Sequence, residues 1–239
     1  MSDLGTMIWK EAKDLIFPGG WGQWIRPLIV VGAVGVALPW RAGLPWLELS
    51  PFELLLVLWV PFINIISFIG DAIAGERERH TLETLLASRM PDHAILLGKV
   101  IVTVGYAWGM ALVSLLLGAG AANLSTGQGP GNWVFYHPVE LFLEALALCL
   151  LISLLAASAG VLISLHVATV RQAQQVLIIG TIVLIFGGIL ALSALPADFF
   201  AAFSYVQILL IAIAVLTLLD AVLLGLALVS FQRSRLILS

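Results

Sequence analysis

Charged residues are scarce in this sequence. Asp, Glu, Lys and Arg make up 10% of its 239 residues, and hydrophobic residues make up 61%. Soluble domains carry about 25% charged residues. A chain with so few polar side chains does not cover a globular surface with them, so we expect it to use lipid as its solvent. The predicted class is an all-α membrane protein with one domain over residues 1–239.

Cysteine and the common catalytic motifs are also nearly or wholly missing. The single cysteine, Cys149, excludes an intrachain disulfide and a cysteine-based metal cluster, and we interpret it as a small buried hydrophobe. The four histidines show no metal-ligand spacing, so no metal site is predicted. The motifs G-x-x-x-x-G-K-[ST], G-x-S-x-G and H-E-x-x-H do not occur. Basic patches with interleaved aromatics are missing, which excludes nucleic acid as a partner. The sequence therefore predicts no enzyme activity of its own and no cofactor in this chain.

Six long apolar runs are present instead. They lie at about 24–39, 52–74, 95–122, 139–167, 176–195 and 205–230. Six spans with both termini on one side place ten of the eleven basic residues on that side: Lys10, Lys13, Arg26, Arg77, Arg79, Arg89, Lys99, Arg171, Arg233 and Arg235. Only Arg41 falls on the other side. The positive-inside rule makes the shared side cytoplasmic.

The N-terminal segment, within 1–20, has the pattern of an amphipathic helix over residues 2–16. Its apolar face would carry Leu4, Met7, Ile8, Leu15 and Ile16, and its polar face Lys10, Glu11, Lys13 and Asp14. We expect this helix to lie in the headgroup plane, with a soluble arm as the alternative. No cleavable signal peptide is apparent.

Three polar residues interrupt the predicted spans. Asn64 and Ser67 follow Pro61 in the second span, and Asn64 is expected either to hydrogen-bond a neighbouring helix or to line a substrate path. Asp220 lies inside the sixth span, where an acid is costly, so a functional role is one hypothesis. The other is an acid that water or a neighbouring Ser or Thr satisfies.

The predicted external loops hold aromatic side chains and acids. The loop at 123–138 contains Trp133, Phe135, Tyr136 and His137, which we interpret as an aromatic belt at the membrane surface, and a loop at 41–51 contains Trp46. Glu140 and Glu144 follow one turn apart. We interpret them as helix N-terminal acids rather than as a catalytic pair.

Residues 75–99, GERERHTLETLLASRMPDHAILLGK, form the one long polar interruption of the chain. Leu82, Leu85 and Leu86 follow helical spacing, so the segment is expected to form a short amphipathic helix that ends at Pro91, with Asp92 capping the next helix. A charged helix between two spans is placed to touch something outside the membrane.

The string G-E-R-E-R-x-T-L-E-x-L-L, followed by L-L-G-K, resembles the cytoplasmic loop of permease subunits from the type-2 exporter class of ABC transporters. The matching residues are Gly75, Glu76, Arg79, Thr81, Leu82, Glu83, Leu85, Leu86, Gly98 and Lys99. His80 and the late position of Pro91 depart from the usual pattern. The resemblance implies that residues 75–92 hold a coupling helix that docks on a separate ATPase subunit. Leu82, Leu85 and Leu86 would fill its groove, and Glu76, Arg77, Arg79 and Glu83 would form charge pairs at the rim.

The resemblance implies the permease subunit of an ATP-driven exporter, paired with a second copy or homologue and with ATPase subunits that bind ATP and Mg²⁺. It also implies a bacterial or archaeal cytoplasmic membrane, and a re-entrant hairpin on the outer side between spans five and six, over 196–204. Two alternatives stay open: a self-contained secondary transporter or channel, and a component of a heme- or cofactor-handling assembly, which Trp133 and His137 alone favour. Short external loops favour a lipid-like or amphipathic cargo.

Overall fold

The computed structural model describes residues 3–16, 22–69, 74–79, 91–129, 131–167, 169–193 and 204–231. Over these ranges the regular elements are helices and there is no strand, which confirms the predicted all-α class for this part of the chain. In chain order they are α1 (Asp3–Ile16), α2 (Gly22–Gly32), the π-helix η1 (Ala33–Ala37), α3 (Leu38–Ala42), the 3₁₀-helix η2 (Leu44–Glu48), α4 (Pro51–Ile69), α5 (Ala74–Glu78), α7 (Asp92–Ser125), α8 (Val139–His166), α9 (Val170–Ser193) and α11 (Tyr205–Ser230).

Four stretches of the described residues are long and apolar enough to cross a membrane. They are Trp24–Ala42, Asp92–Ser125, Val139–His166 and Tyr205–Ser230. The apolar part of α4, Pro51–Ile66, is shorter, and α9 is a helix of 24 residues. These lengths fit a membrane protein, since a tilted or straight crossing takes about 20 residues.

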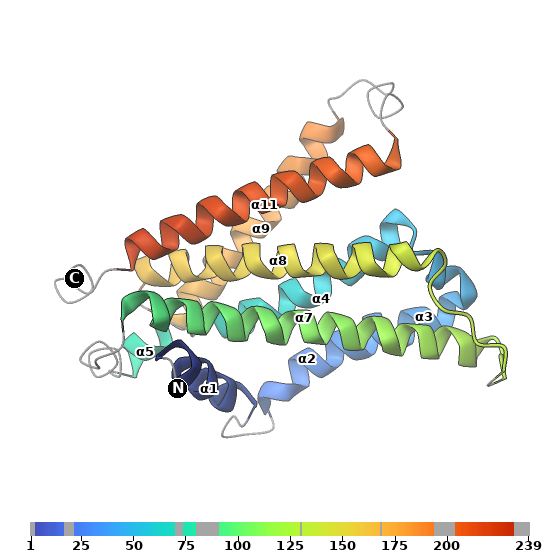
Figure 1. Cartoon of the computed structure of the whole chain (residues 1–239), viewed down its shortest axis with the longest axis horizontal. Helices are drawn as coiled ribbons and strands as arrows, with labels where there is room; N and C mark the ends of the chain where they lie inside the picture. The colour runs from blue at the N-terminus through green and yellow to red at the C-terminus, as the bar shows by residue number, and fades with distance from the viewer. Residues whose placement is uncertain are drawn as a thin grey trace.

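Helices α7 and α8 lie along the long axis of the bundle, and α9 crosses it at an angle (Figure 1). Helices α7 and α8 run side by side, α4 packs on both, and α11 packs along α8. One end of the bundle, here called the proximal end, gathers α1, α5, the starts of α7 and α9, and the ends of α8 and α11. The opposite, distal end holds α3, η2, the end of α7 and the starts of α8 and α11. The candidate site lies at the proximal end.

The first apolar helix is longer than the sequence pattern indicated. The prediction ended it near Pro39 or Trp40, but helical turns continue from α2 through η1 and α3 to Ala42. Pro39 does not end the helix: it stands in the first turn of α3, directly after the π-helix η1, and the backbone on its N-terminal side stays helical with a changed hydrogen-bond pattern. At Gly35 this helix approaches α7 so closely that a Cβ atom would lie 2.9 Å from the Ser114 carbonyl oxygen.

The distal end corrects the predicted loop at 123–138. Asn123 is still helical and fully buried; its amide donates to the Val134 carbonyl and accepts from the Val134 N–H, both at 2.8 Å. Tyr136, predicted in an aromatic belt, is 1% exposed and donates its hydroxyl to the Leu115 carbonyl at 2.8 Å. Trp46, from the predicted external loop at 41–51, is buried in the same apolar cluster. The loop therefore folds back onto α7, where Gly118 leaves room for both rings.

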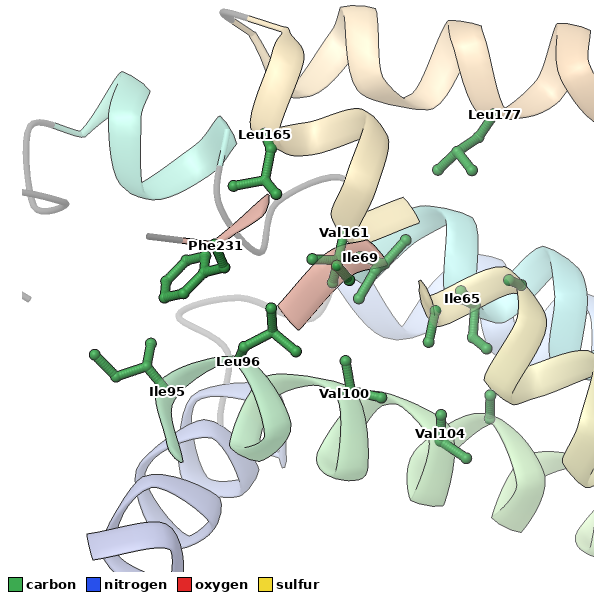
Figure 2. Close-up of a cluster of buried hydrophobic side chains, with 14 of the residues drawn as sticks. Ile65, Ile69, Ile95, Leu96, Val100, Val104, Val161, Leu165, Leu177 and Phe231 are labelled. Carbon is green, nitrogen blue, oxygen red and sulfur yellow. The ribbon is translucent and has the colours of Figure 1, made fainter. Parts of the chain in front are cut away.

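A second apolar cluster closes the bundle just inside the proximal end (Figure 2). It joins Ile65 and Ile69 of α4, Ile95, Leu96, Val100 and Val104 of α7, Val161 and Leu165 of α8, Leu177 of α9, and Phe231 after α11. Gly160 of α8 makes the contact with α4 possible, because a Cβ atom there would overlap Ile69. Helices from both halves of the chain are thus held in one core.

Candidate functional site

Helix α1 is seated on the first turns of α7. Met7 is fully buried, and a Cβ atom on Gly98 would lie 2.6 Å from Met7 Cγ, so only a glycine admits this approach. The predicted helix over residues 2–16 is thus confirmed over Asp3–Ile16, but its polar face differs from the prediction. Glu11 follows Met7 by one turn and faces inward with it, because a charged partner on α7 receives its carboxylate.

Lys99 is that partner, and it is 4% exposed. Its Nζ atom lies 3.0 Å from Glu11 Oε1 of α1 and 3.3 Å from Glu76 Oε1 of α5. Lys10 lies at the rim of the same group, 3.2 Å from Glu11 Oε1 and 3.6 Å from Glu76 Oε1. Two ammonium groups thus balance two carboxylates, which is the condition for burying charge at tolerable cost. We call Lys10, Glu11, Glu76 and Lys99 the proximal ion network.

The carboxylates of this network favour the charged form of Lys10. Partial burial lowers the pKa of Lys10, but the carboxylates of Glu11, Glu76 and Asp14 raise it by more, so its pKa lies above the ordinary value. Lys10 therefore stays charged at any physiological pH. The network joins three elements that are far apart in sequence.

A fourth element is joined to α5 through its next acid. Glu78 Oε1 accepts a hydrogen bond from the Val170 N–H at 3.1 Å, at the N-terminus of α9. Thr169 Oγ1 accepts from the Gln172 N–H at 3.2 Å in the same turn. The first N–H groups of a helix have no partner inside it, and these two oxygens supply partners. The five-residue α5 is thus tied to α1, α7 and α9.

The residues predicted to couple to an ATPase are described only in part. Gly75 is buried in α5, Glu76 belongs to the proximal ion network, and the exposed Arg79 donates its backbone N–H to the Gly75 carbonyl at 3.0 Å. The side chain of Arg77 and the whole of Thr81, Leu82, Glu83, Leu85 and Leu86 lie outside the described residues. The expected hairpin at 196–204 also lies almost wholly outside them.

Two details of this segment were not foreseen. The carboxylate of Glu76, for which charge pairs with a partner subunit were predicted, pairs within this chain with Lys99 and Lys10. Asp92 was expected to cap α7, but the capping position is Pro91 and α7 begins at Asp92. The backbone of Pro91 is extended, so Asp92 takes the first helical position, where its charge still suits the helix dipole.

The intramembrane polar residues have separate surroundings. The Asn64 amide donates to the Val60 carbonyl of its own helix at 2.7 Å and is 2% exposed. The side chain of Ser67 lies outside the described residues. Asp220 is 3% exposed, and neither of its carboxyl oxygens has a hydrogen-bond partner. The structure does not bring Asn64 and Asp220 into one site.

A cavity of about 240 Å³ opens at the proximal end beside these elements. It is lined by Asp92, His93 and Leu96 at the start of α7 and by Leu228 and Phe231 at the end of α11. The described residues contain no cluster of His, Cys, Asp or Glu that could hold a metal ion.

Sequence reasoning missed Lys10, Glu11 and Glu78 as parts of the site. Lys99 was one of the residues that match the family motif, but the prediction assigned it no role. A signal was present, since a lysine just inside an apolar run needs an acid near it, and Glu11 and Glu76 are acids on neighbouring segments. Which acid it meets depends on how α1 packs, which no local pattern shows.

Comparison with known proteins agrees with this architecture. The family described as "ABC-2 family transporter protein" matches residues 51–225, about three quarters of the chain. The chain therefore belongs to the ABC-2 family of transporter proteins. It is an integral membrane protein, and the family is a membrane component of ABC transporters that lacks ATPase motifs itself. No curated protein matches the chain.

Proposed function

We propose that the chain is the transmembrane permease subunit of an ATP-driven exporter. Two copies, or this chain and a homologue, form the substrate path. Separate ATPase subunits bind ATP and Mg²⁺ and dock on residues 75–92. The observation that carries this proposal is the anchoring of α5, where the matched motif begins, to three other elements by Glu76 and Glu78.

A six-span topology with cytoplasmic termini is part of the proposal. The described helices support it, because α7 and α9 start at the proximal end and α8 and α11 finish there (Figure 1). Lys10, Lys99 and Arg171 lie on elements of this end, whereas α3, which carries Arg41, lies at the other. This distribution follows the positive-inside rule when the proximal end faces the cytoplasm of a bacterial or archaeal cell.

The anchoring of α5 also explains how motion of a docked ATPase would reach the membrane helices. A docked ATPase would push on the segment at 76–90, and α5 at its start is held by buried ion pairs to α1 and α7 and by a cap to α9. A small rigid element fixed to three helices moves with them rather than bending alone. Closure of the ATPase pair would in this way shift the helices that enclose the path.

The experiment is a pull-down of the tagged chain in mild detergent, with ATPase activity measured in the eluate. The test variant is Leu85→Asp, which would place a charge in the docking groove, and the matched control is Leu85→Met, which keeps an apolar side chain of similar volume. We expect the wild type and Leu85→Met to retain a stoichiometric P-loop subunit with ATPase activity, and Leu85→Asp to lose both while still inserting in the membrane.

Two outcomes would overturn the proposal. If the chain purifies without any ATPase under gentle conditions, the result would favour a self-contained transporter or channel. Full retention of the ATPase by Leu85→Asp would show that the docking surface lies elsewhere.

A further inference from the structure

Asp220 is a buried carboxyl without a partner. It lies in α11, is 3% exposed, and both its oxygens lack a hydrogen bond. Helices α8 and α11 pack against each other, and no Lys, Arg or His occurs in residues 145–165 of α8 or 206–230 of α11. Of the charges on other nearby helices, Lys99 is held by two carboxylates, Asp92 and Glu53 are acids, and Arg171 is exposed. An unpaired charge is costly in lipid, so this carboxyl has to hold a proton or a cation.

A second unpartnered polar group lies at the same level. Helices α8 and α11 run in the same direction (Figure 1), Tyr205 donates its hydroxyl to Glu144 at 2.7 Å, and Leu165 and Phe231 share one cluster (Figure 2). The first pair relates residue 144 of α8 to residue 205, and the second relates residue 165 to residue 231. The same two offsets along the parallel helices put Asp220 level with residues 154–159 of α8. Ser158 is in that range, is fully buried, and its hydroxyl has no hydrogen-bond partner.

Helical periodicity places both side chains on stripes that lead to the shared cluster of Leu165 and Phe231. Ser158 precedes Leu165 by two helical turns, and Asp220 precedes Phe231 by three. Asp220 lies fifteen residues after Tyr205, which is about 22 Å along the helix at 1.5 Å per residue. This depth is inside a hydrocarbon core about 30 Å thick.

We propose that Asp220 and Ser158 form an intramembrane binding site for one positively charged group, the ammonium of an amphiphilic cargo. The inference rests on the exporter function proposed above and names its substrate class. An ammonium has three N–H donors, and the site has three acceptor oxygens, two on Asp220 and one on Ser158. On binding, the carboxyl releases its proton to water and keeps the ammonium as its counter-charge.

The surroundings favour an amphiphile over an inorganic ion. A hard metal cation takes about six oxygen ligands, twice the number that these two side chains offer. The outer face of α11 beside Asp220 is apolar, with Leu218, Leu219 and Val222 exposed, and suits an alkyl chain. The proximal cavity reaches Leu228, two helical turns from Asp220 on the same helix.

The test uses cell membranes that contain the full tagged chain with whatever partners it has. A hydrophobic carbodiimide modifies a carboxyl that holds a proton in apolar surroundings, and mass spectrometry measures the fraction of the Asp220 peptide that stays unmodified. Both the carbodiimide adduct and an amide formed when the amine captures the activated carboxyl count as modification. The competing probes are dodecylamine, dodecanol at the same submicellar concentration, and sodium chloride at physiological ionic strength. Asp220→Asn, which is isosteric and uncharged, reports labelling at other residues.

We expect the carbodiimide to modify Asp220, dodecylamine to suppress the modification by about tenfold, and dodecanol and sodium to leave it unchanged. Ser158→Ala should keep the modification in the absence of amine and require about tenfold more dodecylamine for the same protection, since it removes one hydrogen bond to a charged group.

Three results would overturn the assignment. An unmodified Asp220 would mean that the carboxyl holds no exchangeable proton. Equal protection by dodecanol would mean that the alkyl chain alone fills the space. Protection by sodium would mean that the ligand is an inorganic ion. None of these readings needs an ATPase subunit, so a failed pull-down refutes the exporter function without affecting the labelling result.

Discussion

Replacing Lys99 by methionine removes the only fully buried cation of the proximal ion network. Methionine keeps most of the volume and the apolar stem but leaves the carboxylates of Glu11 and Glu76, whose side chains are 17% and 13% exposed, without their nearest partner. Lys10 remains, but its side chain is 43% exposed and it lies farther from Glu76, at 3.6 Å.

The expected loss follows from this geometry. Removing one partner of a buried ion pair costs about 3–5 kcal/mol, because the remaining charge stays buried and unpaired. Lys10 still compensates part of the charge, so we expect a value near the lower limit, about 3 kcal/mol. In a chain of about this size each kcal/mol lowers the melting temperature by roughly 2–4 °C. Lys99→Met should therefore lower it by roughly 6–12 °C.

The assay is thermal unfolding of the purified chain in lipid nanodiscs. The control is the same substitution in a Glu11→Gln, Glu76→Gln background, where no carboxylate is left unpaired. There Lys99 is itself the unpaired charge, so Lys99→Met should leave stability unchanged or raise it. The triple variant should lie within about 1 kcal/mol of the wild type, as replacing a buried ion pair by groups of similar shape is often neutral. An equal loss in both backgrounds would refute the reasoning, because it would show that Lys99 acts through packing and not through its charge.

Two further predictions concern close packing at opposite ends of the bundle. Gly98→Ala should loosen α1 and increase its cleavage by added protease, since the new methyl group meets Met7. The control Gly105→Ala, with open space around it, should leave the cleavage of α1 unchanged and stabilise α7 by up to about 1 kcal/mol. Equal cleavage of the two variants would contradict the packing of α1 on Gly98. Asn123→Ala should cost about 2–4 kcal/mol and speed hydrogen exchange at the Val134 amide, because it leaves both the N–H and the carbonyl of Val134 unpaired. An unchanged exchange rate at Val134 would rule out the paired loop.

For the proximal ion network, the sequence predicted the region of the site but not the roles of its residues. The motif pointed to residues 75–99 as the region that matters, and Gly98 and Lys99 were matched residues. Their role was not readable, because it depends on a helix 88 residues earlier in the chain, from which Glu11 reaches Lys99. Helical periodicity placed Glu11 on a solvated face, and only the packing of Met7 on Gly98 turned it inward.

The distal end shows the opposite case, in which a sound local rule was overridden. Aromatic residues next to a span are typical of a membrane-surface belt, and the exposed Trp133 and Phe135 are compatible with that rule. Tyr136 and Trp46 are buried because Gly118 on α7 leaves a recess for their rings and the Leu115 carbonyl accepts the tyrosine hydroxyl. A recess formed by a distant helix leaves no trace in the local sequence.

The sequence by itself determined that this chain is a helical membrane protein of the ABC-2 family type without an ATPase motif. Composition and the length of apolar runs decide the helical membrane class, because lipid admits only segments whose backbone groups are satisfied within a helix or a closed barrel. The family type follows from the resemblance of residues 75–99 to the family's cytoplasmic loop. The tertiary structure decided which charges are buried together and which are left alone. Lys99 meets Glu11 and Glu76 because three helices converge on it, and Asp220 meets no opposite charge because α8 presents only uncharged side chains to it. Both outcomes depend on how close the helices come, which is set by small residues and shape over the whole bundle.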